Sequence, residues 1–187
     1  MSILYDRLRK YGYISPEAEK EIKQHIVTME KRKGDLLIKT GQVSKNLYIL
    51  EKGSIRAYLM KGDKEVSTWF LFEDYFFSPV FSLFNNKPSR ENIQLIEDAV
   101  INYIPYETLL SLCNIYPELN LIVRKIIEEY CSFIEERMLS FQIESATERY
   151  NNLIKEYPES LQRISLGYIA SYLGISQETL SRIRKNK

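Results

Sequence analysis

The chain has 187 residues, of which 44% are hydrophobic and 27% are charged, and its formal net charge is +1. This length allows one full domain with a smaller appendage and excludes two large domains, since domains usually hold ~100–200 residues. The composition is that of a folded globular protein, neither disordered nor fibrous. The near-zero net charge gives no reason to expect that bulk charge binds nucleic acid or a membrane surface, so a charged partner needs a local footprint.

Cysteine, histidine and apolar runs narrow the class of protein further. Cys113 and Cys131 lie in apolar helical surroundings, and the N-terminal segment has no continuous apolar run that directs export, so we expect reduced thiols and a cytoplasmic protein. No apolar stretch reaches the ~18 residues that a bilayer span needs, because serine and proline interrupt even the aromatic segment 75–84. The single histidine, His25, has no partner set for zinc or an iron–sulfur cluster, so no metal or cofactor is expected.

The first part of the chain has the pattern of a β domain. Four glycines fall within residues 34–62, and none follows until Gly167. Short runs rich in β-branched, aromatic and aliphatic residues alternate there with turn dipeptides, a pattern typical of strands. We predict a mostly β unit over roughly residues 25–108, with strands at 35–39, 46–50, 54–60, 66–72, 91–96 and 99–104.

Beyond Pro117, apolar residues recur at alternating four- and three-residue steps, which indicates one long helix with a wide apolar face. At about 25 residues it would be ~37 Å long, more than a small domain needs to cover its own sheet. Packing on the β unit and a two-helix dimer seam both fit, and the double stripe favours the seam. The predicted seam consists of Val123, Ile127, Tyr130, Ile134, Met138 and Phe141.

The remaining chain predicts three shorter helices. Ser145, followed by a glutamate three residues later, has capping-box spacing at the start of a helix that stops at Pro158. Ser165 can cap a helix over residues 166–173, and Ser176 can cap a final helix that runs toward the chain end.

The last two helices match a helix-turn-helix pattern. Ala170 is small where the helices cross, and Gly174 allows the positive φ of the turn. Residues 176–187 carry four basic residues and one acidic residue, a local charge that suits DNA. Arg182 can donate hydrogen bonds to guanine, and Glu178 can accept one from cytosine. The alternative interpretation is an ordinary helical hairpin that has a basic end and does not bind DNA. The candidate DNA-binding residues are Ser176, Gln177, Glu178, Thr179, Ser181, Arg182, Lys185 and Lys187.

Two regions resemble one known family. Residues 174–183 (GISQETLSRI) look like the recognition helix of the Crp/Fnr family of bacterial transcription regulators. Residues 33–35 (KGD) and 47–56 (LYILEKGSIR) resemble the β-roll of cyclic nucleotide-binding domains, so the likeness covers nearly the whole chain. The resemblance implies homodimers joined through a long helix. It also implies base contacts from Glu178 and Arg182, whereas glutamine stands at position 177 where the family has an arginine.

The family fold is of the α+β class. The resemblance implies an N-terminal antiparallel β-roll (a double-stranded jelly roll) flanked by helices, followed by a long dimerisation helix and an all-α helix-turn-helix domain. The three parts would span residues 1–116, 117–144 and 145–187.

The effector site departs from the family pattern. Cyclic-nucleotide binders of the family hold the ribose with a glutamate at the start of a short helix and the phosphate with an arginine. Pro79 stands in place of that glutamate, so the resemblance does not favour cyclic AMP, and we expect Ser78 to cap the helix with Pro79 in its first turn. Arg90 falls near the phosphate position, although a surface ion pair is the alternative. The candidate residues for a small anionic effector are Ser78, Val80, Ser89 and Arg90.

Together these features predict a homodimeric, sequence-specific DNA-binding transcription regulator without catalytic activity. Its expected partners are double-stranded DNA, a second copy, RNA polymerase and a small effector, with no membrane. Family members usually continue into a β-hairpin wing, where only residues 184–187 follow here, so we expect a wingless unit. The alternative is a small-molecule sensor that acts through protein contacts and has a degenerate DNA-binding tail. A third possibility is a cupin-like enzyme on the same β architecture. Such an enzyme would need a cluster of metal-binding histidines, and the chain has a single histidine, His25.

Overall fold

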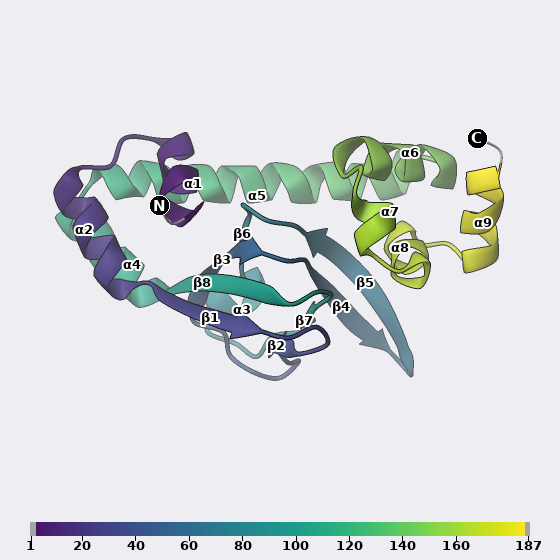
Figure 1. The fold of residues 1–187 in the computed structure, drawn as a ribbon, viewed down its shortest axis with the longest axis horizontal. Helices are drawn as coiled ribbons and strands as arrows, with labels where there is room; N and C mark the ends of the chain where they lie inside the picture. The colour runs from purple at the N-terminus through teal and green to yellow at the C-terminus, as the bar shows by residue number, and fades with distance from the viewer. Residues whose placement is uncertain (1–2, 186–187) are drawn as a thin grey trace.

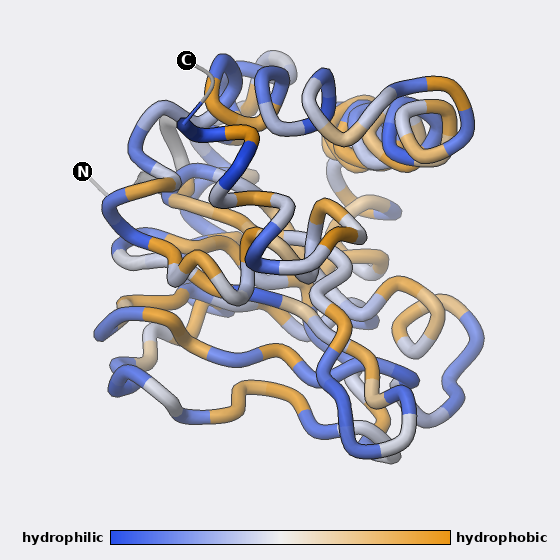
Figure 2. The backbone as a smooth tube through the Cα atoms, turned by 90° about the vertical axis from the view of Figure 1, so that its right-hand side faces the viewer, coloured by the Kyte–Doolittle hydropathy of each residue, from blue (hydrophilic) through white to orange (hydrophobic). Residues whose placement is uncertain are grey.

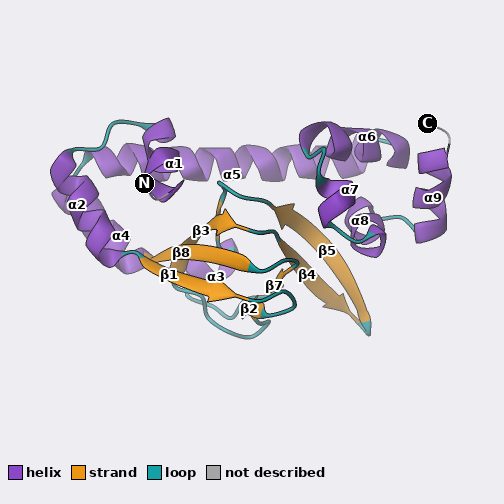
Figure 3. Ribbon diagram, in the orientation of Figure 1, coloured by secondary structure: helices purple, strands orange, loops and turns teal. Residues whose placement is uncertain are grey.

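The computed structural model describes residues 3–185 and consists of a β-roll, a long helix that runs above it, and groups of shorter helices at the two ends of that helix (Figure 1). The helices and strands form separate layers (Figure 3). This arrangement confirms the predicted α+β fold class. The helices are α1 (Ile3–Tyr11), α2 (Pro16–His25), α3 (Val80–Asn85), α4 (Tyr106–Ile115), α5 (Glu118–Ile143), α6 (Ala146–Glu156), α7 (Ser160–Arg163), α8 (Leu166–Leu173) and α9 (Gln177–Lys185).

The roll consists of two four-stranded antiparallel sheets, with strand orders β1-β8-β3-β6 and β2-β7-β4-β5. All six predicted strands are present, and β1 and β6 are additional. The sequence pattern missed β1 because its outer face is exposed, and β6 because it has only two residues. The strands are β1 (Val27–Lys31), β2 (Leu36–Ile38), β3 (Asn46–Lys52), β4 (Ile55–Lys61), β5 (Lys64–Leu71), β6 (Phe76–Phe77), β7 (Asn92–Leu95) and β8 (Ala99–Pro105).

Apolar side chains fill the space between the two sheets. Leu50, Ile55 and Ile101 are fully buried there, and burial of a side chain of this size contributes about 1.5–3 kcal/mol. Hydrophobic segments run along the strands, and hydrophilic segments occupy the turns at the edge of the roll (Figure 2). The turn from β3 to β4 requires Gly53, because its φ is +101° and a Cβ atom would lie 2.7 Å from the Asp98 carbonyl oxygen.

A second core joins the N-terminal helices to the long helix. Leu8 of α1, Ile22 of α2 and Leu112 of α4 pack in the same cluster as Ile122 of α5. Ser15 caps α2, because its hydroxyl accepts a hydrogen bond from the Ala18 N–H at 3.3 Å, and the same hydroxyl donates to a carboxylate on α5. These contacts attach the start of α5 to the roll.

Helix α5 has 26 residues, close to the predicted length, and spans ~39 Å at ~1.5 Å per residue. It lies over the roll along most of the molecule (Figure 1). Cys131 on α5 is exposed, and Cys113 on α4 is buried. Neither cysteine forms a disulfide.

The predicted C-terminal helices are α6, α8 and α9. The capping box is formed as predicted: the Ser145 hydroxyl accepts from the Glu148 N–H at 3.3 Å, and the Glu148 carboxylate accepts from the Ser145 N–H at 2.7 Å. The four-residue α7 was not predicted, since one turn carries no periodic signal. These helices share a third core with Phe70 and Phe72 from the β5 side of the roll, so they pack directly on the sheet.

Candidate nucleic-acid interface and ligand cleft

The turn between α8 and α9 is closed by its glycine. Gly174 has φ +69°, and its N–H donates to the carbonyls of Ala170 and Ser171. The next N–H, that of Ile175, also bonds to the Ala170 carbonyl, at 3.0 Å. Such a pair of bonds across a left-handed residue ends a helix sharply and directs the chain into the next one. The buried side chains of both helices then form one core, which consists of Ile169, Ala170, Leu173 and Leu180.

A serine cap sets the start of α9. The Ser176 hydroxyl accepts a hydrogen bond from the Thr179 N–H at 3.2 Å and lies 3.2 Å from the Thr179 hydroxyl. A hydrogen bond from Ser176 lowers the pKa of Glu178, and the positive charge of Arg182 lowers it further. Glu178 is therefore ionised at neutral pH and able to accept hydrogen bonds from a base edge.

The predicted DNA-binding residues lie together on the outside of the motif. Thr179 is half-buried under the Arg182 guanidinium, which donates to its hydroxyl at 3.2 Å. Lys187 lies outside the described residues. The other predicted residues are exposed, namely Ser176, Gln177, Glu178, Ser181, Arg182 and Lys185. Positions 177, 178, 181, 182 and 185 share one face of α9, since residues three and four apart are neighbours on a helix.

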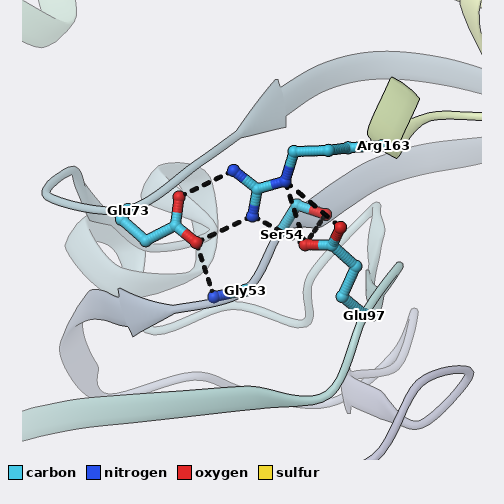
Figure 4. Close-up of polar contacts among 5 residues, drawn as sticks. All are labelled: Gly53, Ser54, Glu73, Glu97 and Arg163. Carbon is cyan, nitrogen blue, oxygen red and sulfur yellow. Dashed lines mark hydrogen bonds and ion pairs between the residues drawn. The ribbon is translucent and has the colours of Figure 1, made fainter. Parts of the chain in front are cut away.

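Contacts that the sequence did not predict hold this motif against the roll. Arg163 of α7 donates to both carboxylate oxygens of Glu73, at 2.7 and 2.8 Å, and to Glu97 at 2.6 Å (Figure 4). Burial raises the pKa of Glu73, but hydrogen bonds from Arg163 and from the Gly53 N–H outweigh it, so the pKa is lowered. The pKa of Glu97 is lowered, chiefly by hydrogen bonds from Arg163 and then from Ser54. The Arg163 guanidinium therefore connects α7 to two loops of the roll through the ionised carboxylates of Glu73 and Glu97.

Helix α8 packs on strand β5. The Ser171 hydroxyl accepts from the Ser67 N–H at 2.9 Å and donates to the Glu65 carbonyl at 3.2 Å. The Phe70 and Tyr172 rings meet at a centroid distance of 5.1 Å. This interface combines backbone hydrogen bonds with aromatic packing, so it fixes the orientation of α8 relative to the sheet.

The C-terminal end of α5 and the first turns of α6, which contain Arg149, hold the turn of the motif. Arg149 donates to the Leu173 carbonyl at 3.1 and 3.2 Å and to the Glu144 carbonyl at 2.6 Å. A Cβ atom on Gly174 would lie 3.1 Å from the Phe141 ring, so the turn lies directly on α5. The motif is thus attached to the roll and to the long helix together.

A cleft of about 910 Å³ separates the roll from α5. Of the predicted effector residues, Ser78 and Val80 line it, whereas Ser89 and Arg90 do not. Arg90 is exposed, with its guanidinium carbon 3.9 Å from the centroid of the Phe81 ring. The Ser89 hydroxyl instead donates to the main chain two residues on, at 2.8 Å. The structure does not assemble the four residues into one anion site.

The expected cap of α3 is wrong. Pro79 occupies the N-cap position with ψ 87°, and the helix begins at Val80 without a side-chain cap. The Ser78 hydroxyl donates to the Asn46 carbonyl at 3.0 Å, so this serine stabilises the contact with β3. No side-chain cap therefore adds polarity to the start of this short helix.

The predicted dimer stripe faces the cleft more than the outside. Met138 is 53% exposed and does not line the cleft. Tyr130 and Ile134 are 39% and 42% exposed although they form its wall. The stripe residues that line the cleft are Val123, Ile127, Tyr130, Ile134 and Phe141. The single chain leaves this stripe partly uncovered.

Two further features bear on the class of protein. Within residues 3–185, none of the helices has the length and the apolar run that crossing a membrane requires. In the same part of the chain, no set of three histidine, cysteine, aspartate or glutamate side chains is arranged to hold a metal ion.

Comparison with known proteins matches the roll to a domain model and most of the chain to known regulators. Residues 28–116 match the model of the cyclic nucleotide-binding domain. The fumarate and nitrate reduction regulatory protein of Yersinia pestis is 25% identical over 168 residues, which cover 81% of this chain and 65% of that protein. This chain therefore spans less than two thirds of the length of that relative.

Two solved structures have the same fold. FixK2 from Bradyrhizobium japonicum superposes with a TM-score of 0.75 at 19% identity, covering 86% of this chain and 83% of the other. The catabolite activator protein of Thermus thermophilus gives 0.60 at 19% identity, covering 96% and 85%. The fold is that of a cyclic nucleotide-binding-type roll connected by a long helix to a helix-turn-helix. The chain is thus similar to regulators of the Crp/Fnr type over most of its length.

Proposed function

We propose that this chain is a sequence-specific DNA-binding transcription regulator that acts as a homodimer. One observation carries the proposal: the exposed polar and basic face of α9, which contains Arg182 and Glu178 on a firmly packed helix-turn-helix. Arginine and glutamate are residue types that read guanine and cytosine in the major groove. The regulatory role named for the Yersinia pestis relative supports the same function.

The homodimer would form through α5. Its partly exposed apolar residues, among them Ile134 and Met138, provide a surface for a second copy of the helix. A dyad between two copies would place two recognition helices in successive major grooves, so the operator is a pseudo-palindrome with half-sites ~34 Å apart. RNA polymerase and a small effector are the further partners of this proposal.

Selection of bound sequences from a random duplex pool tests the function. The selected duplex is then titrated by fluorescence anisotropy over a salt series, beside a scrambled duplex of the same composition. We expect tighter binding of the selected duplex and a fall in affinity with salt, since phosphate contacts release counterions. Arg182→Ala should weaken binding to the selected duplex. Arg32→Ala removes the same charge from an exposed turn of the roll, so it is the control and should leave binding unchanged.

Absence of salt-dependent binding at tens of micromolar protein would contradict the proposal. That result would support a small-molecule sensor that acts through protein contacts alone. Equal binding of the selected and scrambled duplexes would show that the chain binds DNA but without sequence specificity.

A further inference from the structure

Glu91 brings a half-buried carboxylate to the cleft between the roll and α5. The Trp69 indole N–H donates to Glu91 Oε2 at 3.2 Å. Burial raises the pKa of Glu91 to about 7, although the hydrogen bond from Trp69 partly offsets it. Tyr130 of α5 lines the same cleft, and burial, followed by the charge of Glu91, raises the pKa of its phenol. Among the described residues, no ion pair forms with Glu91, so this carboxylate has no cationic partner.

The charged residues that line the cleft are mostly acidic. They are Arg137 and the glutamates Glu91, Glu129, Glu136 and Glu156. Arg137 lies two helical turns, ~10 Å, from Tyr130 along α5. Its guanidinium carbon is 3.5 Å from the centroid of the Tyr172 ring, and it donates to the Tyr172 carbonyl. Glu129 is paired with Arg7, and Arg137 is held by Tyr172. An anion beside Glu91 would therefore meet the carboxylates of Glu91, Glu136 and Glu156.

Strand β5 contributes a polar group that is not used within the chain. Ser67 is 3% exposed and lines the cleft, and its hydroxyl has no hydrogen-bond partner within residues 3–185. Buried polar groups are almost always paired, so this hydroxyl, like that of Thr68 on the same wall, has unused hydrogen-bonding capacity beside the cleft. This observation is independent of the charge of the lining.

We propose that the cleft binds an aromatic molecule with a protonated nitrogen, which lies at Glu91 while the ring packs against Trp69 and Tyr130. This inference rests on the proposed function and deepens it, because it names the class of effector. A cation offsets the desolvation of this half-buried carboxylate, and aromatic faces attract that cation further. The volume of about 910 Å³ is within the ~300–1,000 Å³ of small-molecule sites.

The cleft also reaches the DNA-binding motif. Its lining extends from Val80 of α3 to Ser171 of α8 and Gly174 of the turn. A ligand held at Glu91 therefore occupies the same cleft whose far end is the helix-turn-helix.

Matched probes of opposite charge test the proposal. Trp69 is the single tryptophan of the chain, so its fluorescence reports directly on the cleft. The probes are 2-phenylethylamine and 3-phenylpropionate, which share a phenethyl group and differ in the sign of their charge. Each is titrated at millimolar concentration into the intact chain, with affinity confirmed by calorimetry. We expect the amine to change the Trp69 emission and to bind at least tenfold more tightly than the carboxylate.

Variants locate the binding at the carboxylate. Glu91→Gln should weaken amine binding at least tenfold, whereas Glu91→Asp, which keeps the charge, should retain most of it. Glu30→Gln, on the exposed side of β1, is the control and should bind like the unaltered chain. Circular dichroism establishes that each variant is folded, and if Glu91→Gln is not, the preference of the unaltered chain for the amine over the carboxylate carries the test.

Three outcomes would overturn the proposal: tighter binding of the carboxylate, no response to the amine, or equal amine binding by the unaltered chain and folded Glu91→Gln. Duplex binding measured without either probe tests the proposed function separately. A chain that binds the amine but no DNA keeps the cleft assignment and loses the regulator. If the chain binds DNA but not the amine, the proposed regulator function stands and the proposed ligand of the cleft is wrong.

Discussion

The guanidinium carbon of Arg56 lies 3.6 Å from the ring centroid of Tyr168, so the helix-turn-helix covers a buried cation of the roll. The Arg56 side chain is 1% exposed, and its Nε donates to Gln94 Oε1 at 2.9 Å. It also forms an ion pair with Glu65 and stacks on Tyr58 at 4.3 Å. A buried guanidinium depends on such partners, because an unpaired charge away from water is strongly unfavourable.

Removal of the Tyr168 ring should therefore destabilise the chain. Tyr168→Ala loses a cation–π contact of ~0.5–2 kcal/mol together with apolar packing, so we expect ~2 kcal/mol less free energy of unfolding in urea. Tyr168→Phe keeps the ring over Arg56 and should change this free energy by less than ~0.5 kcal/mol. Equal losses in the two variants would show that the hydroxyl, and not the ring, stabilises this interface.

Arg163 should make the attachment of the motif sensitive to acid. The lowered pKa values of Glu73 and Glu97 mean that their stabilisation is present above their ordinary value of 4.5 and is lost as the pH falls through the lowered values. Arg163→Met removes the cation, so its free energy of unfolding should lie below that of the unaltered chain at pH 7 and approach it at pH 3. Urea unfolding over this range measures the difference.

The control for this effect is an exposed ion pair. Arg124 and Glu128 on α5 lie 3.3 Å apart, and both side chains are more than 60% exposed. Arg124→Met should change stability little at any pH, because surface pairs contribute only ~0–1 kcal/mol. A pH-independent loss in Arg163→Met would contradict the role of the two carboxylates.

Glu91 should have the opposite pH dependence. Its pKa rises from 4.5 to about 7 on folding, so the folded chain binds the extra proton between these values and loses stability as the pH rises through them. The loss is at most about 3.4 kcal/mol at 1.36 kcal/mol per pKa unit. Glu91→Gln stays neutral, so its stability relative to the unaltered chain should increase from pH 5 to pH 8. Thermal melts at both pH values check the sign.

Features that depend on local sequence were predictable. The caps at Ser145 and Ser165, together with Gly174, determine where helices begin and end through bonds within a few residues. Such signals need no knowledge of the rest of the chain. The helix-turn-helix and α5 were predicted for the same reason, whereas α7 is too short to carry periodicity.

The site contacts between distant segments were not predictable. Arg163 is 66 residues from Glu97 and 90 from Glu73, and no periodic pattern links such positions. The cleft offers a second case, since Arg90 was predicted to contact an effector, but its neighbour Glu91 lines the cleft. The two residues lie in the bend before β7, where one side chain is exposed and the next is half-buried at the cleft, and the residue types alone do not indicate which one faces it.

A charge introduced into the predicted dimer seam of α5 should dissociate the dimer. Met138 is 53% exposed and lies outside the cleft, so Met138→Glu alters the helix surface without filling the cleft. Two such charges would face each other across the seam, and we expect a shift from dimer to monomer in sedimentation velocity at micromolar concentration. Lys125→Glu, on an exposed position outside the stripe, should leave the dimer intact. A monomeric unaltered chain would contradict the dimer itself.

Arg182 and Lys185 should affect DNA binding in different ways. Arg182→Ala removes a donor suited to guanine, so we expect a loss of about 1–3 kcal/mol on the selected duplex and relaxed preference at one base pair of each half-site. Lys185→Ala removes a charge suited to phosphate, so it should weaken binding to selected and scrambled duplexes alike and reduce the salt dependence. Anisotropy titrations of both duplexes measure the two effects. Equal losses on both duplexes for Arg182→Ala would assign Arg182 to the phosphate backbone, and base reading would then rest on Glu178 and Gln177.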